Sequence, residues 1–158
     1  MIRYLCGVRG AGKTALVPHL VAANTGCVVV DMDEVLVEGH AMGIPIAFDH
    51  ARDAWPAYNR HWVLIASLIA RSTPLLLLGP LLPAEWAAAG GDPSTPFALL
   101  DCPDDVRTQR LHARGWPDEW SVDAIADAAD ARAVITQHIS TACAIDETVA
   151  AIVAWSAT

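Results

Sequence analysis

Short apolar runs of strand length recur along the chain, and longer helical patterns lie between most of them. The runs cover residues 2–6, 27–31, 74–78, 97–101 and 142–145. Each run is apolar almost throughout rather than alternating, which is typical of parallel strands that are covered on both faces. Strands that alternate with helices predict an α/β protein built as a three-layer α/β/α sandwich.

The helical patterns cover residues 13–23, 47–71, 103–114, 121–139 and 147–156. The long segment 47–71 should be divided at Pro56, because proline interrupts a helix that approaches it from the N-terminal side. Its second part, 63–70, is apolar all round, so we expect it to be buried against the sheet. The glycine- and proline-rich residues 90–96 predict a surface loop.

A glycine-rich motif follows the first predicted strand. Residues 7–14 read Gly-Val-Arg-Gly-Ala-Gly-Lys-Thr, a complete G-x-x-x-x-G-K-[ST] phosphate-binding loop. The strand before it and the helix after it supply the context that the motif requires. Glycines allow successive backbone N–H groups to point at an anion, and the following helix adds its positive N-terminal end. We therefore expect the chain to bind a nucleoside triphosphate.

Individual residues of this loop have separate expected roles. Lys13 is the only lysine in the chain, and from a solvent-facing position it should reach the β- and γ-phosphates. The Thr14 hydroxyl should ligate Mg²⁺. The other expected nucleotide contacts are Gly7, Arg9, Gly10, Ala11, Gly12 and Ala15. The alternative is a glycine-rich turn that carries a solvated lysine.

Two aspartates, Asp31 and Asp33, end the second predicted strand. The carboxyl end of a parallel strand beside a phosphate loop lies at the crevice where such sheets bind ligands. One acid can hold the hydration shell of Mg²⁺, and the other can accept a proton from an attacking hydroxyl. Alternatively, Asp33 merely caps a helix that begins at Glu34. The third strand runs into residues 78–81 without the terminal aspartate common in other phosphate-loop proteins, so the acid is most simply supplied from the second strand.

Three arginines, Arg107, Arg110 and Arg114, fall on one helical face just before a Gly-Trp-Pro break at 115–117. Like charges on one face repel each other unless an anion meets them, and the phosphates of ATP are the obvious anion. A mobile arginine can also neutralise charge in a transition state. The alternative is a solvated cationic face beside neighbouring aspartates.

The order of these motifs resembles the small P-loop kinases of the shikimate kinase, gluconate kinase and adenylate kinase type, a group that includes chloramphenicol phosphotransferase. The resemblance implies a single kinase domain over residues 1–158, with a five-stranded parallel sheet in the order 2-3-1-4-5 and the P-loop NTPase fold. It also implies that residues 41–62 bind the acceptor and that residues 110–120 form a short lid.

By the same resemblance, Asp31 positions Mg²⁺ and Asp33 activates the acceptor hydroxyl. Arg110 lies against the adenine, and Arg114 reaches over the phosphates. The short acidic lid and the reduction of the glycine-rich substrate turn to Gly79-Pro80 depart from shikimate kinase. We therefore do not expect shikimate itself to be the acceptor.

The acceptor pocket should be walled by side chains from the 41–62 segment. Four of them share a face if the helix continues through the proline at 56: Arg52, Trp55, Asn59 and Trp62. Arg60 is adjacent, and Gly79-Pro80 should complete the pocket. An arginine beside an indole suits a carboxylate, a phosphate or a planar ring. Amphipathic packing with an exposed arginine is the alternative.

Composition limits the partners. The net charge of −8 argues against a nucleic-acid-binding face, which normally carries a basic patch. The cysteines Cys6, Cys27, Cys102 and Cys143 form no C-x-x-C pair and are expected to be buried apolar residues in a reducing compartment. The first strand begins at residue 2, and no apolar run has the length of a membrane span, so a cytoplasmic protein is expected.

Together these features predict an ATP- and Mg²⁺-dependent kinase that phosphorylates a hydroxyl or phosphate of a small metabolite, nucleoside or natural product. Its partners should be a nucleoside triphosphate and a small acceptor, and the chain should act as a monomer or homodimer. A polynucleotide 5′-hydroxyl or modified-base kinase is one alternative. A nucleotide-binding regulatory NTPase that has no acceptor is another.

Overall fold

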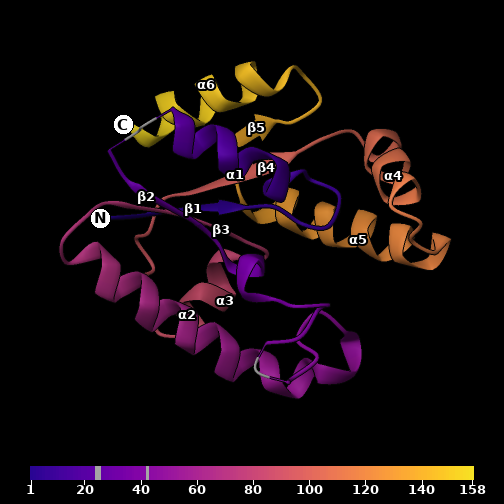
Figure 1. Ribbon diagram of the computed structural model, residues 1–158, viewed down its shortest axis with the longest axis horizontal. Coiled ribbons are helices and arrows are strands. Elements are labelled where there is room, and N and C mark those ends of the chain that lie inside the picture. The colour runs from indigo at the N-terminus through magenta and orange to yellow at the C-terminus, as the bar shows by residue number, and fades with distance from the viewer. Residues whose placement is uncertain (24–25, 42) are drawn as a thin grey trace.

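The computed structural model describes residues 1–23, 26–41 and 43–158. Its centre is a parallel sheet of five strands in the order β2-β3-β1-β4-β5 (Figure 1). The strands are β1 (Ile2–Cys6), β2 (Val28–Asp31), β3 (Leu75–Gly79), β4 (Phe97–Asp101) and β5 (His138–Ser140). The predicted strand order is confirmed.

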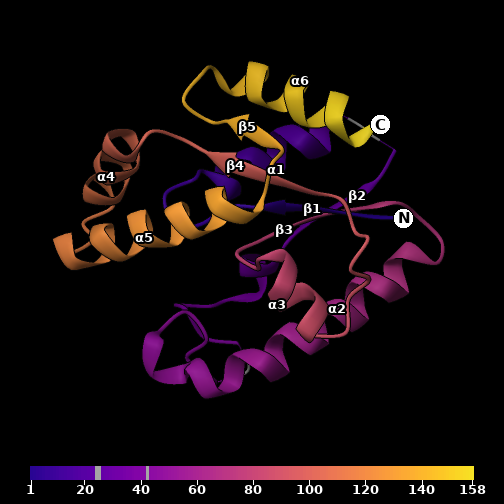
Figure 2. The ribbon, with the colours of Figure 1, turned by 180° about the vertical axis from the view of Figure 1, so that it is seen from behind.

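Helices cover both faces of the sheet, which confirms the three-layer sandwich. The α-helices are α1 (Lys13–Ala22), α2 (Trp55–Ala70), α3 (Pro83–Ala88), α4 (Asp104–Ala113), α5 (Asp118–Val134) and α6 (Ile145–Ser156). The 3-10 helices η1 (Met32–Val35) and η2 (Asp49–Ala54) lie between β2 and α2. Helices α1 and α6 pack on one face, and α2, α3 and α5 pack on the other (Figures 1 and 2).

The central strands explain the continuous apolar runs in the sequence. Leu75 and Leu77 of β3 belong to the core under α2, α3 and α5, whereas Leu76 and Leu78 belong to the core under α1 and α6. All four leucines are at most 2% exposed. A strand that is covered on both faces has no solvent side and therefore shows no alternation.

The prediction of the fifth strand at 142–145 is wrong, because β5 is His138–Ser140. Among the described strands it pairs only with β4, at the edge of the sheet, and Ile139 is its single buried residue. An edge strand with one inward side chain leaves no apolar run in the sequence. The helix predicted to continue to 139 accordingly ends at Val134.

Helix α2 begins at Trp55 with Pro56 in its first turn, so the predicted division at the proline is confirmed. Burial of its whole second part was wrong. Val63 and Ala66 are buried, whereas the outward-facing Leu64, Ile65 and Leu68 are 57, 43 and 48% exposed. The helix covers the sheet from outside, so only one of its faces meets the core. Helix α3, a short element of six residues, was not predicted.

The cysteines differ in burial. Cys6 and Cys102 are buried as expected, but Cys143 is exposed and donates a hydrogen bond from its thiol to the Ser140 carbonyl. The expectation of four buried thiols was therefore wrong, because Cys143 lies in the connection after β5 rather than in a strand. Across the described ranges, no helix has the length and apolar character needed to cross a membrane.

Candidate functional site

The glycine-rich loop joins β1 to α1 at the carboxyl edge of the sheet. It is held there by a bond from Gly7 N to Gly79 O (3.0 Å) and closed by a turn bond from Ala11 N to Val8 O (3.1 Å). Gly10 and Gly12 have φ angles of 78° and 92°, a backbone region that favours glycine. Gly12 is the N-cap of α1, so the positive end of that helix faces the loop.

Lys13 is folded back across the loop. Its Nζ donates to Gly7 O at 2.6 Å and lies 3.6 Å from a carboxylate oxygen of Asp33. A Cβ on Gly7 would lie 2.9 Å from Lys13 Cγ, so the glycine makes room for the lysine stem. The residue is only 9% exposed, which corrects the expectation of a solvent-facing lysine. The ammonium is thereby fixed between the loop and the end of β2.

Asp31 and Asp33 have different roles in the local structure. Asp31 is the N-cap of η1, and its side chain accepts a bond from Asp33 N at 3.1 Å. Glu34 completes a capping box by accepting from Asp31 N at 3.3 Å. The interpretation of Asp33 as a helix cap is therefore wrong, because η1 begins at Met32, two residues earlier than expected. The Asp33 side chain, 44% exposed, is left to face Lys13.

Asp31 has the character of a cation ligand. It is 1% exposed, and its Oδ2 finds no hydrogen-bond donor among the described residues. Burial raises the pKa of its carboxyl to about 6, against the opposing attraction of Lys13. Thr14 is exposed in the first turn of α1 and offers a hydroxyl.

These oxygens fit Mg²⁺, which prefers hard oxygen donors and usually takes only one or two carboxylates beside substrate phosphates and water. Within the described ranges, no three His, Cys, Asp or Glu side chains gather as a metal site of their own. A magnesium ion here would therefore depend on the phosphates for part of its ligand shell.

The three arginines in and just after α4 do not form a single exposed cationic face. Arg107 is fully buried and pairs with Asp101 at 2.7 Å, which corrects the sequence interpretation. Arg110 donates to Gly10 O at 3.2 Å and to Thr141 Oγ1 at 3.0 Å, so it joins the loop to the segment after β5. Arg114 follows α4 as its C-cap and is exposed.

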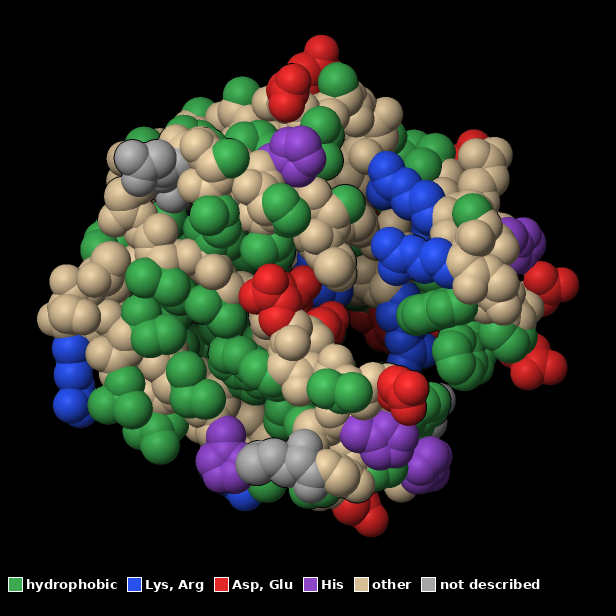
Figure 3. All heavy atoms as spheres, viewed as in Figure 1, with side chains coloured by type: hydrophobic (Ala, Val, Ile, Leu, Met, Phe, Trp, Pro, Cys, Tyr) green, Lys and Arg blue, Asp and Glu red, His purple; other side chains and the backbone are tan. Residues whose placement is uncertain are grey.

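The space-filling view displays the charge arrangement around this edge of the sheet. A hollow lies to the right of centre, with Lys and Arg side chains along one side and Asp and Glu side chains opposite them (Figure 3). In the ribbon view, the carboxyl end of β1 points toward this side, where α4 also lies (Figure 1). An anion bound in such a hollow meets cations on one side while carboxylates remain available on the other.

The connection from α4 to α5 is compact. Gly115 has a φ of 75°, and the Trp116 and Trp120 rings meet edge to face with centroids 5.1 Å apart. His112 and Asp118 lie 2.9 Å apart across the turn. The predicted lid segment is thus a tight, aromatic corner between two helices.

The segment expected to bind the acceptor is irregular in its first half. Trp55 Nε1 donates to Ile46 O at 2.9 Å, and the Arg52 guanidinium lies 5.6 Å from the centroid of the Trp55 ring. Arg60 is exposed. Trp62, in contrast, is 5% exposed within the core, so its predicted place in the pocket wall was wrong.

Gly79 is the last residue of β3 and Pro80 follows it, and the two residues differ in exposure. Pro80 is exposed, whereas a Cβ on Gly79 would overlap Tyr4 Oη and Met32 Sδ. Packing alone therefore accounts for the glycine. Tyr58, which sequence reasoning missed, donates to Met32 O at 2.8 Å and so ties α2 to the turn that carries the aspartates. Its position three residues after Trp55 on one helix was the available signal.

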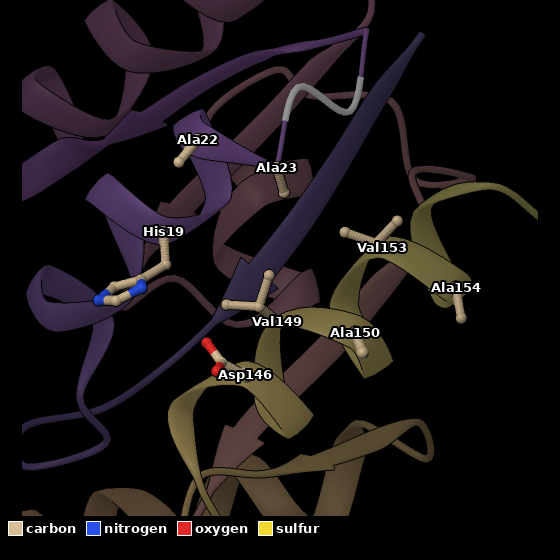
Figure 4. A pocket seen from close by; sticks show the side chains of 8 residues that line it. All are labelled: His19, Ala22, Ala23, Asp146, Val149, Ala150, Val153 and Ala154. Carbon is tan, nitrogen blue, oxygen red and sulfur yellow. The ribbon is translucent and has the colours of Figure 1, made fainter.

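A second hollow lies away from these residues, between α1 and α6 (Figure 4). Its lining is His19, Ala22, Ala23, Asp146, Val149, Ala150, Val153 and Ala154. On α1 these side chains belong to the half that is distant from Lys13 at the helix start. This groove therefore makes no contribution to the candidate site.

Comparison with known proteins finds similarity in structure. No protein-family model and no curated protein sequence matches the chain. A shikimate kinase from Aquifex aeolicus superposes with a TM-score of 0.66 and 18% identity, over 98% of this chain and 95% of that one. A gluconokinase from Sinorhizobium meliloti 1021 gives 0.65 and 22% identity over 99% and 90% of the two chains.

A tunicamycin resistance protein from Deinococcus radiodurans also superposes, with a TM-score of 0.65 and 20% identity over 98% of this chain and 94% of that one. The sheet order and the position of the glycine-rich loop agree with the resemblance inferred from the motifs. At these identities the likeness concerns the fold. The chain has the fold of the small P-loop kinases.

Proposed function

We propose that the protein is an ATP- and Mg²⁺-dependent kinase that transfers the γ-phosphate to a hydroxyl, or to a phosphate, of a small metabolite, nucleoside or natural product. The observation that carries this proposal is the 3.6 Å approach of Lys13 Nζ to the Asp33 carboxylate. A cation suited to the γ-phosphate and a base suited to an acceptor hydroxyl lie side by side.

In the transfer step, the acceptor oxygen attacks the γ-phosphorus while the bond from that phosphorus to the β–γ bridging oxygen breaks, and ADP leaves. The hydroxyl proton passes to an Asp33 carboxylate oxygen. Lys13 offsets negative charge on the phosphates, and we assign the exposed Arg114 to the same task from the other side. Catalysis of this kind depends on positioning and charge neutralisation rather than on covalent chemistry by the protein.

Binding of the nucleotide would rest on the backbone of the loop, through Gly7, Arg9, Gly10, Ala11, Gly12, Thr14 and Ala15. We assign Arg110 to the base end, since it joins the loop to Thr141. Thr14 and Asp31 would hold Mg²⁺, and the unpaired Asp31 Oδ2 supports this assignment. When bound, the ion neutralises charge on the β- and γ-phosphates.

For the acceptor, we propose the 41–62 segment, with Arg52, Trp55 and Arg60 as contacts and Gly79-Pro80 at the base of the pocket. The Arg52–Trp55 stack supports an acceptor that carries an anionic group or a planar ring. Residues 110–120 would close over the site as a lid. The names of two structural neighbours, a gluconokinase and a sugar kinase, support a small hydroxylated acceptor.

The test is a screen of hydroxylated metabolites, nucleosides and natural products for ADP release from Mg·ATP, with thermal stabilisation by Mg·ADP as a binding check. We expect ADP release that depends on one acceptor class and a phosphorylated product in equal amount. ADP release at one rate with or without every acceptor would instead indicate a nucleotide-hydrolysing regulator. Absence of any Mg·ADP binding would contradict the proposal as a whole.

A further inference from the structure

Arg107, which the structure removes from the expected phosphate-facing arginines, connects α4 to the phosphate loop. Arg107 of α4 is 0% exposed. Its Nη1 donates to Arg9 O at 2.7 Å, and its Nη2 donates to Asp101 Oδ1 at 2.7 Å. One guanidinium thus bridges the loop and the end of β4 through two separate nitrogens.

The bond to Arg9 O controls the direction of a peptide group in the loop. In a planar trans peptide, the C=O of one residue and the N–H of the next point in opposite directions. Because Arg107 holds the Arg9 carbonyl toward itself, the Gly10 N–H points away from Arg107. Arg110 acts in the same way on the following peptide, since it donates to Gly10 O at 3.2 Å.

Gly10 is shaped to this contact. A Cβ at this position would lie 2.9 Å from Arg107 Cγ, and its φ of 78° is unfavourable for other residues. The loop backbone can therefore lie directly on the aliphatic stem of Arg107. The arginine supports the loop from behind by packing as well as by hydrogen bonding.

A buried guanidinium requires a counter-charge, and Asp101 provides it. Asp101 also accepts from Arg132 Nε of α5 at 2.7 Å. Asp101 would therefore keep a cationic partner if Arg107 were removed. Arg132 therefore serves as a comparison for Arg107, because both arginines pair with Asp101. The other bonds of Arg132 go to Cys102 O and Asp104, whereas Arg107 donates to Arg9 O in the phosphate loop.

We propose that Arg107 is a positioning residue of the nucleotide site, which fixes the Arg9–Gly10 peptide so that the Gly10 N–H is already directed for a phosphate. Donors that are oriented before the ligand arrives bind it without the cost of ordering the loop. The proposal goes beyond the proposed function by adding a residue that touches neither nucleotide nor acceptor, and it rests on nucleotide binding at this loop.

The experiment compares Arg107→Met with Arg132→Met as a matched control. Titration calorimetry measures affinity for Mg·ADP, and amide hydrogen exchange without nucleotide follows Ala11, whose N–H closes the loop turn at Val8 O. Because a hydrogen bond from a charged donor contributes about 1.5–3 kcal/mol, we expect Arg107→Met to weaken Mg·ADP binding by about 10- to 100-fold. Ala11 should exchange faster in the same variant.

Arg132→Met should lose thermal stability but keep wild-type affinity and Ala11 exchange. Equal losses in both variants, or wild-type values in a folded Arg107→Met, would overturn the proposal. If Arg107→Met does not fold, Arg107→Lys replaces it, because lysine keeps the charge beside Asp101 but lacks two separate forked nitrogens. Wild-type affinity and exchange in Arg107→Lys would then overturn the proposal. If the wild type binds no Mg·ADP, the proposed function fails. The exchange rate of the Ala11 amide then still shows whether Arg107 orders the loop.

Discussion

The two sides of the candidate site, the phosphate loop and the segment proposed to bind the acceptor, are held in place in different ways. On the phosphate side, the loop after β1 is held by backbone bonds to Gly79 and Val8 and by guanidinium groups behind it. On the acceptor side, the chain between η1 and η2 has only the isolated bridges Val37–His40 and Ala41–Ile44 as ladder pairing within the described residues. The first side is fixed by the fold, and the second by local turns.

This difference matches the chemistry that each side would perform. Phosphates are the same in every nucleoside triphosphate, so backbone N–H groups in a fixed loop suffice to bind them. An acceptor differs from enzyme to enzyme, and side chains outside the sheet, such as Arg52 of η2 and Trp55 at the start of α2, can change without disturbing the sheet. Substitutions on the two sides should therefore separate phosphate chemistry from acceptor recognition.

The largest expected effect comes from Asp33, which lies where the two sides meet. Asp33→Asn keeps the shape but removes the proton-accepting carboxylate, so transfer to the acceptor should fall by roughly 10²- to 10⁴-fold. Mg·ATP affinity should change little. Single-turnover transfer with the acceptor found by the screen, beside calorimetry with an ATP analogue, measures both quantities.

The matched control for Asp33 is Glu34→Gln, since Gln can still accept from Asp31 N and preserve the capping box. It should keep near-normal transfer. Full transfer by Asp33→Asn would remove the proposed base, because the structure leaves no capping role at this position to explain the residue otherwise.

Lys13→Met tests the phosphate side alone. Methionine keeps an unbranched stem against Gly7 but removes the ammonium, so turnover should fall by about 10²- to 10³-fold, as for loss of one preorganised donor. The variant should still fold, with a modest loss of thermal stability because the bond from Lys13 Nζ to Gly7 O is gone. Arg71→Met, which changes an exposed arginine that follows α2, serves as the control. Unchanged turnover in the lysine variant would contradict the assignment of the phosphate loop.

Asp31→Asn should make the nucleotide-free protein more stable at high pH. Because burial raises the pKa of the Asp31 carboxyl from 3.8 to about 6, the folded state holds the proton more tightly than the unfolded state. The stability that this provides is complete below pH 3.8 and is lost as the pH rises through about 6. Asparagine, which caps nearly as well as aspartate, escapes that loss.

The gain at pH 8 should be at most about 3 kcal/mol, and it should disappear below about pH 4. Urea unfolding between pH 4 and 8 measures it, with the exposed Asp105→Asn as a control. A variant less stable than the wild type at pH 8 would show that the ionised Asp31 carboxylate does not destabilise the nucleotide-free protein. Weaker Mg²⁺-dependent nucleotide binding should accompany the stabilisation.

The smallest expected effect belongs to the acceptor side. Arg52→Ala should raise the acceptor KM by about tenfold, the loss of one charged contact, with the KM for Mg·ATP unchanged. Arg71→Ala is the control, because this arginine lies at the opposite end of α2. A change in the KM for Mg·ATP instead of the acceptor KM would show that the two sides are not separable at Arg52.

The sequence predicted the alternation of strands and helices, the phosphate loop and the paired aspartates, because these depend on local patterns: apolar runs, glycine spacing and acids at a strand end. The order of the strands in the sheet followed only from the resemblance to the small P-loop kinases. The sequence could not predict the burial of Arg107, whose partner Arg9 O lies 98 positions away along the chain. Strand β5 escaped prediction because a single buried residue, Ile139, carries no periodicity.

At the site, the sequence could name Asp31 and Asp33 but could not distinguish them. Which acid caps η1 depends on the backbone turn, and that turn brings Glu34 back to Asp31 N. The helix that carries Trp55 and Trp62 shows the same limit, since spacing places both on one helix but only packing determines that Trp62 belongs to the core.

Gly79 limits where the proposed metal site could take its carboxylate from. An aspartate at the end of β3 would need space that Tyr4 Oη and Met32 Sδ already occupy. An aspartate at position 79 would therefore force these two buried side chains to shift, whatever its effect on metal binding. An acid at the end of β3 would require Tyr4 and Met32 to move or to become smaller, whereas the end of β2 accommodates Asp31 as it stands.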